Sequence, residues 1–173
     1  KAEAGKEVST DLTVNEGMVN FIVVLSNEAG DGPRAKHSMY AGNDSPKAVD
    51  NLKLTLDENG HATVTWEAPK EGVHKGYIGQ LTYDVFRNVG GTSEKVSSGQ
   101  TATEFSETLT KGKLSSYSYS VQAINSTKKS DLATTNGETY GNAMEVPFFD
   151  DFLTMEDSKV YTIIDANKDK CTW

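Results

Sequence analysis

The chain has 173 residues, of which 36% are aliphatic or aromatic, and it carries a net charge of −8. This length suits one or two domains, and the acidic charge argues against nucleic acid or an anionic membrane surface as a partner. No apolar run is long enough for a membrane-spanning helix, and the single cysteine, Cys171, excludes an internal disulfide. Tyr, Thr, Ser, Val and Gly recur throughout, which predicts short strands joined by turns and very little helix.

Residues 1–45 predict three strands, at Glu7–Val14, Val19–Asn27 and Ala35–Tyr40. A short linker, Asn43–Lys47, follows and is stiffened by Pro46. Three strands are too few for a sandwich of their own. We therefore expect residues 1–45 to be the C-terminal part of a first unit in a longer, modular protein.

Residues 46–143 predict a complete unit. Asn59-Gly60 and Gly90-Gly91 have the composition of hairpin turns. The predicted strands are residues 48–56, 61–66, 81–87, 95–97, 104–109, 117–123 and 132–139. Turn signals that recur about every 8–12 residues between alternating strands are typical of a β-sandwich.

An internal repeat relates the two parts. The run Phe21–Asn27 matches Tyr119–Asn125, which begins 98 residues later, and Tyr40 stands 100 residues before Tyr140 in a second match. A period near one hundred residues is the size of one immunoglobulin-like sandwich and is too long for a solenoid repeat. The first copy thus contributes only its last strands.

Two motifs of the complete unit resemble fibronectin type III domains. One is Trp66-Glu-Ala-Pro69, and the other is the run from Tyr117 through Tyr119, Val121 and Ala123 to Asn125. The resemblance implies an all-β fold, a fibronectin type III-like (immunoglobulin-like) antiparallel β-sandwich with partial β modules on either side. It also implies that Trp66 is buried and that Tyr117 is a corner residue whose hydroxyl bonds to the backbone.

Residues 144–173 resemble the opening of a cleaved-adhesin module, a jelly-roll domain found in surface proteins of anaerobic Gram-negative bacteria. The matching runs are Val146–Phe152 and Val160–Trp173. The resemblance implies that this segment is the N-terminal start of such a module, in a bacterial protein that is secreted or displayed at the cell surface.

One candidate metal site lies in this last segment. Asp165, Asn167 and Asp169 place three oxygen ligands two residues apart, as calcium loops do. Lys170 stands where an EF-hand loop needs glycine, and an Asx-rich turn between strands explains the same residues. No other cofactor is expected.

The remaining candidates for chemistry give weak patterns. His37, His61 and His74 lack the spacing of zinc ligands, and Cys171 is best explained as a passive thiol. No Gly-x-Ser-x-Gly elbow is present, although the sequence leaves a Ser-His-Asp triad open. We therefore expect a non-enzymatic protein.

These observations favour a non-catalytic cell-surface module for adhesion or spacing, which contacts protein or glycan within a larger protein. Two alternatives stay open: an accessory region of a secreted protease or glycoside hydrolase, and a carbohydrate-binding module with a row of exposed aromatic rings. The unpaired strand edges of residues 1–45 and 144–173 predict pairing with each other, with the complete unit or with another chain.

Overall fold

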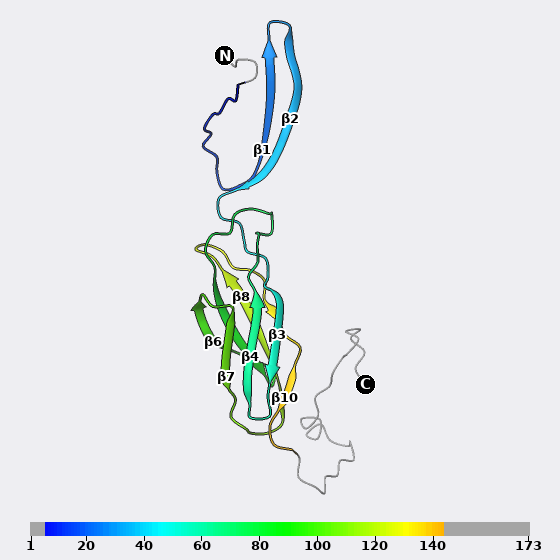
Figure 1. Cartoon of the computed structure of the whole chain (residues 1–173), viewed down its shortest axis with the longest axis vertical. Coiled ribbons are helices and arrows are strands. Elements are labelled where there is room, and N and C mark those ends of the chain that lie inside the picture. The colour runs from blue at the N-terminus through cyan, green and yellow to red at the C-terminus, as the bar shows by residue number, and fades with distance from the viewer. Residues whose placement is uncertain (1–5, 144–173) are drawn as a thin grey trace, which may run out of the picture.

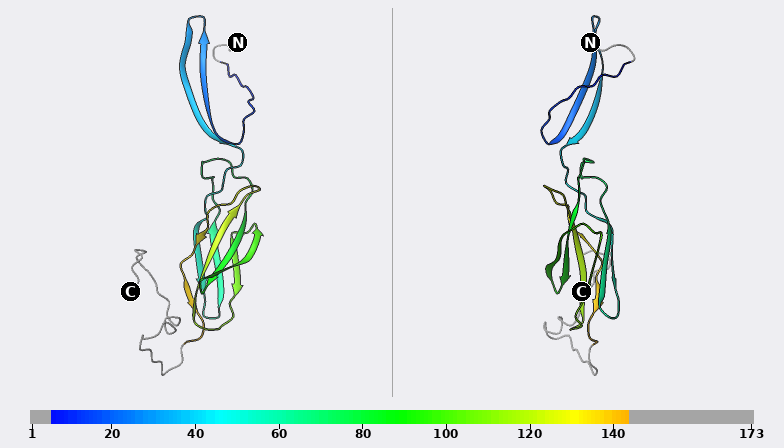
Figure 2. Two further views of the ribbon diagram at one scale, coloured as in Figure 1. Left: turned by 180° about the vertical axis from the view of Figure 1, so that it is seen from behind. Right: turned by 60° about the vertical axis from the view of Figure 1, so that its left-hand side comes forward.

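The computed structural model describes residues 6–143, and it contains two parts. A long hairpin stands on one end of a two-sheet sandwich, and the described chain leaves the sandwich at the opposite end (Figures 1 and 2). The strands are β1 (Gly17–Asn27), β2 (Gly30–Ala41), β3 (Asp50–Leu56), β4 (His61–Glu67), β5 (Thr82–Val89), β6 (Thr92–Gln100), β7 (Glu104–Thr108), β8 (Ser115–Ile124), β9 (Ala133–Thr134) and β10 (Glu138–Tyr140).

The sandwich is a fibronectin type III-like fold, as the sequence predicts. One sheet has the order β3-β4-β7, and the other has the order β10-β8-β5-β6, with β9 also paired to β8. Every strand pair is antiparallel. The strand expected at residues 132–139 is divided into β9 and β10, which pair with different residues of β8.

The core lies between the two sheets and is built by alternation along the strands. On β4, Ala62, Val64 and Trp66 are at most 4% exposed, while the intervening side chains are less buried. Trp66 meets the ring of Tyr83 edge-on, with centroids 5.3 Å apart. The burial of Trp66 confirms the prediction, and each large side chain so buried stabilises the fold by about 1.5–3 kcal/mol.

A polar network also joins the two sheets. The Tyr119 hydroxyl on β8 donates a 2.6 Å hydrogen bond to the Glu107 carboxylate on β7, and Arg87 on β5 donates another of 2.6 Å to the same carboxylate. Tyr117 packs against the edge of the core. Within residues 6–143 its hydroxyl makes no hydrogen bond, so the expected corner contact with the backbone is absent, and the hydroxyl of Tyr119, two residues later, bonds a carboxylate.

The hairpin pairs β1 with β2 from Gly17–Ala41 to Asn27–Gly30, with a bulge between Val24 and Ser26. Both strands were expected, and β2 begins five residues before the predicted Ala35. The strand expected at Glu7–Val14 is not formed: within the described residues this segment pairs with no other strand. A lone extended segment has no ladder of hydrogen bonds to hold it, which explains the difference.

Candidate functional site

The hairpin and the sandwich meet at a built junction. We define the junction as Asn43–Pro46 together with the loop Gly72–Tyr77 and the turn Asn125–Lys128. Asp44 is fully buried, and the Asp44 amide donates to the Tyr77 carbonyl at 2.7 Å while the Val73 amide donates to the Ser45 carbonyl at 2.9 Å. The sequence predicts a linker here, yet the backbone of this segment is hydrogen-bonded to the loop that follows β4.

The Asp44 carboxylate is the centre of the junction. It accepts hydrogen bonds from the backbone amides of Ser45 at 2.8 Å, His74 at 2.6 Å and Gly76 at 3.1 Å. The imidazole Nδ1 of His74 lies 2.9 Å from Oδ1, the oxygen that also accepts from Ser45, whereas the amides of His74 and Gly76 donate to Oδ2. A buried carboxylate is costly unless each oxygen is paired, and here both oxygens are.

These contacts decide the ionisation of Asp44. Burial alone would raise the pKa of the carboxyl group, but the hydrogen bonds from His74, Gly76 and Ser45 together outweigh burial and hold the pKa below its ordinary value. The junction therefore contains a stable negative charge at neutral pH. It also has the partners that such a charge requires.

Two glycines make room for this carboxylate. A Cβ atom placed on Gly72 would lie 2.3 Å from a carboxylate oxygen of Asp44, and one placed on Gly76 would lie 2.8 Å from the Cβ of Tyr40. Side chains at either position would displace the groups that they meet. The loop can approach Asp44 closely only because both positions lack a side chain.

Asn125, the last residue of the type III-like motif, lies directly after β8 and binds the connecting segment from the other side. Its side-chain amide donates a 2.8 Å hydrogen bond to the Asp44 carbonyl, and its own oxygen accepts from the backbone amide of Lys128 at 2.7 Å. Asn125 is 6% exposed. This residue therefore stabilises its own turn and links that turn to the segment that connects the hairpin to the sandwich.

Lys128 completes the contact with the hairpin. Its ammonium donates to the Tyr40 hydroxyl at 2.8 Å and to the Asn43 carbonyl at 2.6 Å, and it forms an ion pair with Glu16. It also lies 4.9 Å from the centroid of the Tyr40 ring. The hydrogen bonds to Glu16 and Tyr40 raise the pKa of Lys128, so the ammonium stays charged.

These contacts suit the junction to holding the hairpin and the sandwich together. The Asp44–His74 pair resembles the acid–imidazole half of a catalytic triad, but within the described residues no hydroxyl or thiol hydrogen-bonds to His74.

The other candidate site residues lie away from the junction or outside the described chain. His61 contacts Thr108, and His37 is on β2. Residues 6–143 contain no group of three side chains suited to a metal ion. The predicted calcium ligands Asp165, Asn167 and Asp169, and the Cys171 thiol, lie outside the described residues.

A shallow groove of about 520 Å³ lies beside the junction. Its walls come from the segment 68–70 after β4, the segment 76–81, the start of β5 and the stretch between β6 and β7, and they include Pro69, Tyr77, Leu81, Tyr83, Thr101 and Thr103. Tyr77 is 72% exposed and is the only strongly exposed aromatic ring in the part of the chain that the structure describes. One ring is not the row of rings that a carbohydrate-binding module would present.

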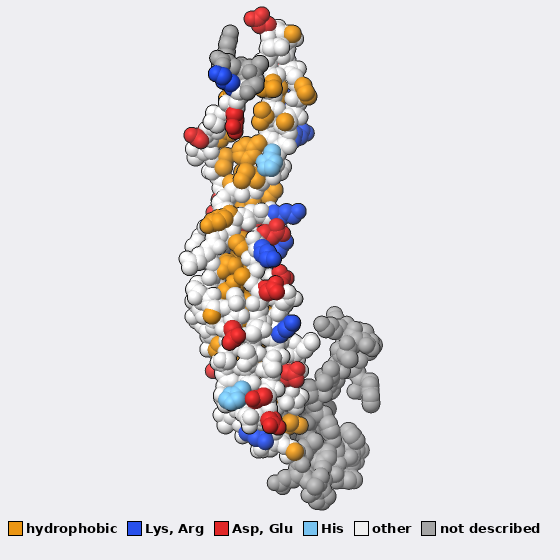
Figure 3. All heavy atoms as spheres, in the orientation of Figure 1, with side chains coloured by type: hydrophobic (Ala, Val, Ile, Leu, Met, Phe, Trp, Pro, Cys, Tyr) orange, Lys and Arg blue, Asp and Glu red, His pale blue; other side chains and the backbone are white. Residues whose placement is uncertain are grey.

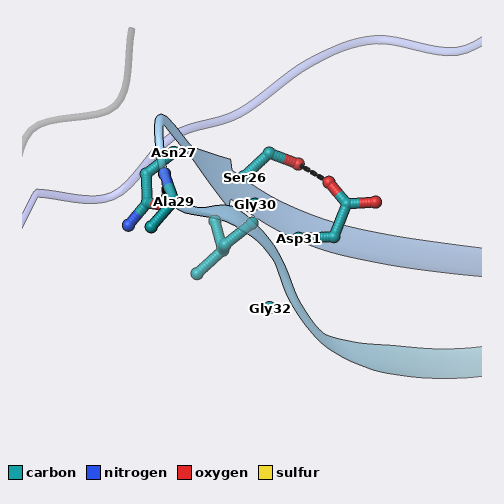
Figure 4. Close-up of a pocket in the computed structure, with 7 residues that line it drawn as sticks. Ser26, Asn27, Ala29, Gly30, Asp31 and Gly32 are labelled. Carbon is teal, nitrogen blue, oxygen red and sulfur yellow. Dashed lines mark hydrogen bonds between the residues drawn. The ribbon is translucent and has the colours of Figure 1, made fainter.

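A second hollow lies at the hairpin tip, where residues 25–32 turn from β1 into β2 (Figure 4). The Ser26 hydroxyl donates a 2.5 Å hydrogen bond to the Asp31 carboxylate across the tip, and the Asn27 side chain accepts from the Ala29 amide at 2.8 Å. These bonds are exposed and local. They stabilise the turn, so the hollow follows from the turn's shape.

Among residues 6–143, no helix has the length and hydropathy needed to cross a membrane.

No family model matches this chain, and no curated protein matches it. Solved structures with a similar arrangement include domains d3-d4 of the rat CD45 extracellular region (14% identity, TM-score 0.48, covering 80% of this chain and 73% of that one). Another is the FN1-FN3 region of chicken CNTN1 (15% identity, TM-score 0.46, covering 75% and 44%). A third is the FN5 domain of Drosophila Lar (16% identity, TM-score 0.42, covering 57% and 99%). This chain thus spans less than half of the CNTN1 structure, and identities of this size transfer no ligand or partner to it.

Proposed function

We propose that this chain is a non-catalytic spacer and adhesion module of a multidomain cell-surface protein, in which the junction fixes the orientation of successive β-domains. The observation that carries the proposal is the complete burial of Asp44 in the segment that connects the hairpin to the sandwich. A spacer must hold its neighbouring domains in a fixed relative orientation. Such an orientation requires contacts that form in only one arrangement of the two domains.

The contacts of Asp44 have this property. Its side chain binds the loop after β4, and its carbonyl accepts from Asn125, the residue directly after β8. If the segment that carries Asp44 moved away from the sandwich together with the hairpin, both groups would lose these partners, and each buried polar group left unpaired costs about 1–3 kcal/mol. A flexible linker, in contrast, keeps its polar groups in water.

The alternatives predict other features. A carbohydrate-binding module would gain affinity from several exposed rings, whereas Tyr77 is alone among the described residues. An accessory region of a secreted protease or glycoside hydrolase needs the same geometry as a spacer. It differs only in the catalytic domain that the parent protein would carry. Protein contact through loops and strand edges is the mode of adhesion that fits this surface best.

The test measures the distance between the hairpin tip and the far end of the sandwich by pulsed electron paramagnetic resonance. Spin labels are attached to Glu28→Cys and Lys111→Cys in a Cys171→Ser background, because residues 28 and 111 are exposed. We expect a single narrow distance distribution, and we expect Asp44→Ala to broaden it while the circular dichroism of the sandwich persists.

Glu71→Gln is the matched control. Glu71 pairs with Lys47 near the junction, but both side chains are nearly half exposed. An exposed pair of this kind contributes about 0–1 kcal/mol. The distribution should therefore remain narrow in this variant. A broad distribution in the unaltered chain, or an equal response to both substitutions, would contradict the proposed spacer.

A further inference from the structure

The two copies of the internal repeat differ in how much of their matching strands is covered. Tyr119, Val121 and Ala123 on β8 are all fully buried. The residues 98 positions earlier, on β1, are Phe21, Val23 and Leu25. Val23 is 59% exposed and Leu25 is 74% exposed, and Phe21 is only partly buried. The same pattern therefore faces a core in one copy and solvent in the other.

The sandwich shows what covers this pattern when it is buried. The inner face of β8 packs in one core with residues of the opposite sheet, among them Val64 and Trp66 of β4. β8 is also hydrogen-bonded on both edges, to β10 and β9 on one side and to β5 on the other. On β1 both features are missing, because this strand pairs only with β2 in the described structure.

Charge distinguishes the two faces of the hairpin. Directly paired residues in an antiparallel sheet share a face, so Val19, Phe21 and Val23 lie with Met39, His37 and Ala35. The other face carries Arg34 and Lys36, which pair with Val24 and Ile22. The Val19–Val23 face thus has one titratable side chain, His37, and no side chain that is always charged. On the face of the hairpin visible in Figure 3, hydrophobic side chains are prominent.

Residues 6–16 leave this face partly open, since Val23 stays 59% exposed with the segment in place. Val8 and Leu12 are 67% and 64% exposed, and this segment forms no strand. We propose that the Val19–Val23 face and the free edge of β1 are the interface for a sheet of antiparallel strands with alternating apolar residues, supplied by the polypeptide N-terminal to the hairpin in the full-length protein. The hairpin is then the last strand pair of a second sandwich.

The repeat also gives the size of this partner. A sandwich of this class has about 100 residues, and its front part would need roughly 55 residues before Lys1. Those residues would contribute a strand that pairs with β1 as β5 pairs with β8, and a sheet that covers Phe21 and Val23. This inference does not depend on the proposed spacer function, since the face can be covered whether or not the junction is rigid.

The test compares thiol labelling at two neighbouring positions on opposite faces. Val23→Cys and Ile22→Cys, made in a Cys171→Ser background, start from nearly equal exposures of 59% and 55%. Each is placed in chain 1–173 and in the same chain extended by its natural upstream sequence. In chain 1–173 both thiols should react quickly with a maleimide. In the extended protein we expect the Val23→Cys thiol to react about 100-fold more slowly, because labelling then requires local opening, while Ile22→Cys keeps its rate.

Other results would overturn the inference. Equal rates for Val23→Cys in the two proteins would mean that the upstream polypeptide leaves this face bare. If the Val23→Cys thiol is labelled slowly in chain 1–173, and its labelling rate falls further as the protein concentration rises, a second copy of the chain covers this face. Amide hydrogen exchange of β1 in the unsubstituted proteins gives an independent readout, since the amides facing away from β2 should become protected only in the extended protein.

Discussion

The ring of Tyr40 on β2 stacks on the imidazole of His74, with centroids 5.0 Å apart and planes inclined by 14°. The first residue belongs to the hairpin and the second to the loop that follows β4. His74 also binds Asp44 through its backbone amide and through Nδ1. One residue of the sandwich therefore contacts the hairpin through a ring face and the connecting segment through two hydrogen bonds.

Gly72→Ala should destabilise the junction through a steric clash. The new Cβ would lie 2.3 Å from an Asp44 oxygen whose position is fixed by its hydrogen bonds, and overpacking of this kind costs about 1–3 kcal/mol. We expect the tip-to-sandwich distance distribution to broaden and the melting temperature to fall. Gly112→Ala is the control, since nothing lies within 4 Å of its Cβ position, and it should change stability by less than about 0.5 kcal/mol. Similar behaviour of the two variants would contradict this account.

The sandwich should lose stability in acid partly through Asp84, which is 3% exposed on β5. Burial alone would raise the pKa of this carboxyl group, but hydrogen bonds from Lys95 at 2.5 Å, Gly99 at 3.0 Å and Ser98 at 3.0 Å lower it below its ordinary value. A lowered folded-state pKa means that the contribution is complete above the unfolded-state pKa of about 3.9 and is lost as the pH falls below it.

Urea denaturation between pH 7 and pH 3 measures this effect. The free energy of unfolding should fall with the pH near and below 4, and Asp84→Asn should be less stable at pH 7 with a flatter acid dependence. An acid dependence as steep in Asp84→Asn as in the parent chain would place the titrating group elsewhere.

Tyr119→Phe should cost about 1.5–3 kcal/mol of unfolding free energy, because it removes a buried hydrogen bond to the charged Glu107. Tyr83→Phe is a matched control: Tyr83 is 2% exposed and, within residues 6–143, its hydroxyl makes no hydrogen bond. The Tyr83→Phe variant should therefore lose less unfolding free energy than Tyr119→Phe. Urea denaturation of both variants gives the comparison, and equal losses would show that the Glu107 contact contributes little.

Trp66→Phe should be tolerated far better than Trp66→Ala. The Trp66 indole Nε1 is buried without a hydrogen-bond partner among the described residues, so phenylalanine removes an unsatisfied donor while keeping most of the contact with Tyr83. Alanine leaves a cavity, and such truncations cost about 3–5 kcal/mol. Thermal unfolding followed by circular dichroism measures both, and a phenylalanine variant as unstable as alanine would show that the indole ring itself is required.

Much of the sandwich could be predicted from the sequence, because its signals are local. Alternation along β4 and β8 sets which side chains enter the core, and the Trp66 and Tyr117–Asn125 motifs identify the strands that face each other. Tyr40 and Tyr140 occupy matching positions in the internal repeat, but they have different roles in the structure. Tyr140 is 8% exposed in the core, whereas Tyr40 contacts His74 and Lys128 at the junction.

The junction could not be predicted in the same way. Asn43-Asp44-Ser45-Pro46 has the composition of a linker, and nothing within it shows that Asp44 is buried. Its partners His74 and Asn125 lie 30 and 81 residues away in the chain, so the site exists only after the sandwich has formed. The close spacing of Gly72 and Gly76 is the one local signal, since it marks a loop that something approaches closely.

The positions at which the chain enters and leaves the sandwich have a mechanical consequence. The polypeptide enters from the junction into β3 and leaves after β10 at the opposite end (Figure 1). A pull transmitted from one neighbour to the next would thus run along the strands, and the hydrogen bonds that join β3 to β4 would be loaded together in shear. Bonds loaded in this way must break nearly simultaneously, whereas the β1–β2 hairpin, whose two strands leave from the same end, can open one pair at a time. Where no upstream sheet covers it, the hairpin should therefore extend under tension well before the sandwich does.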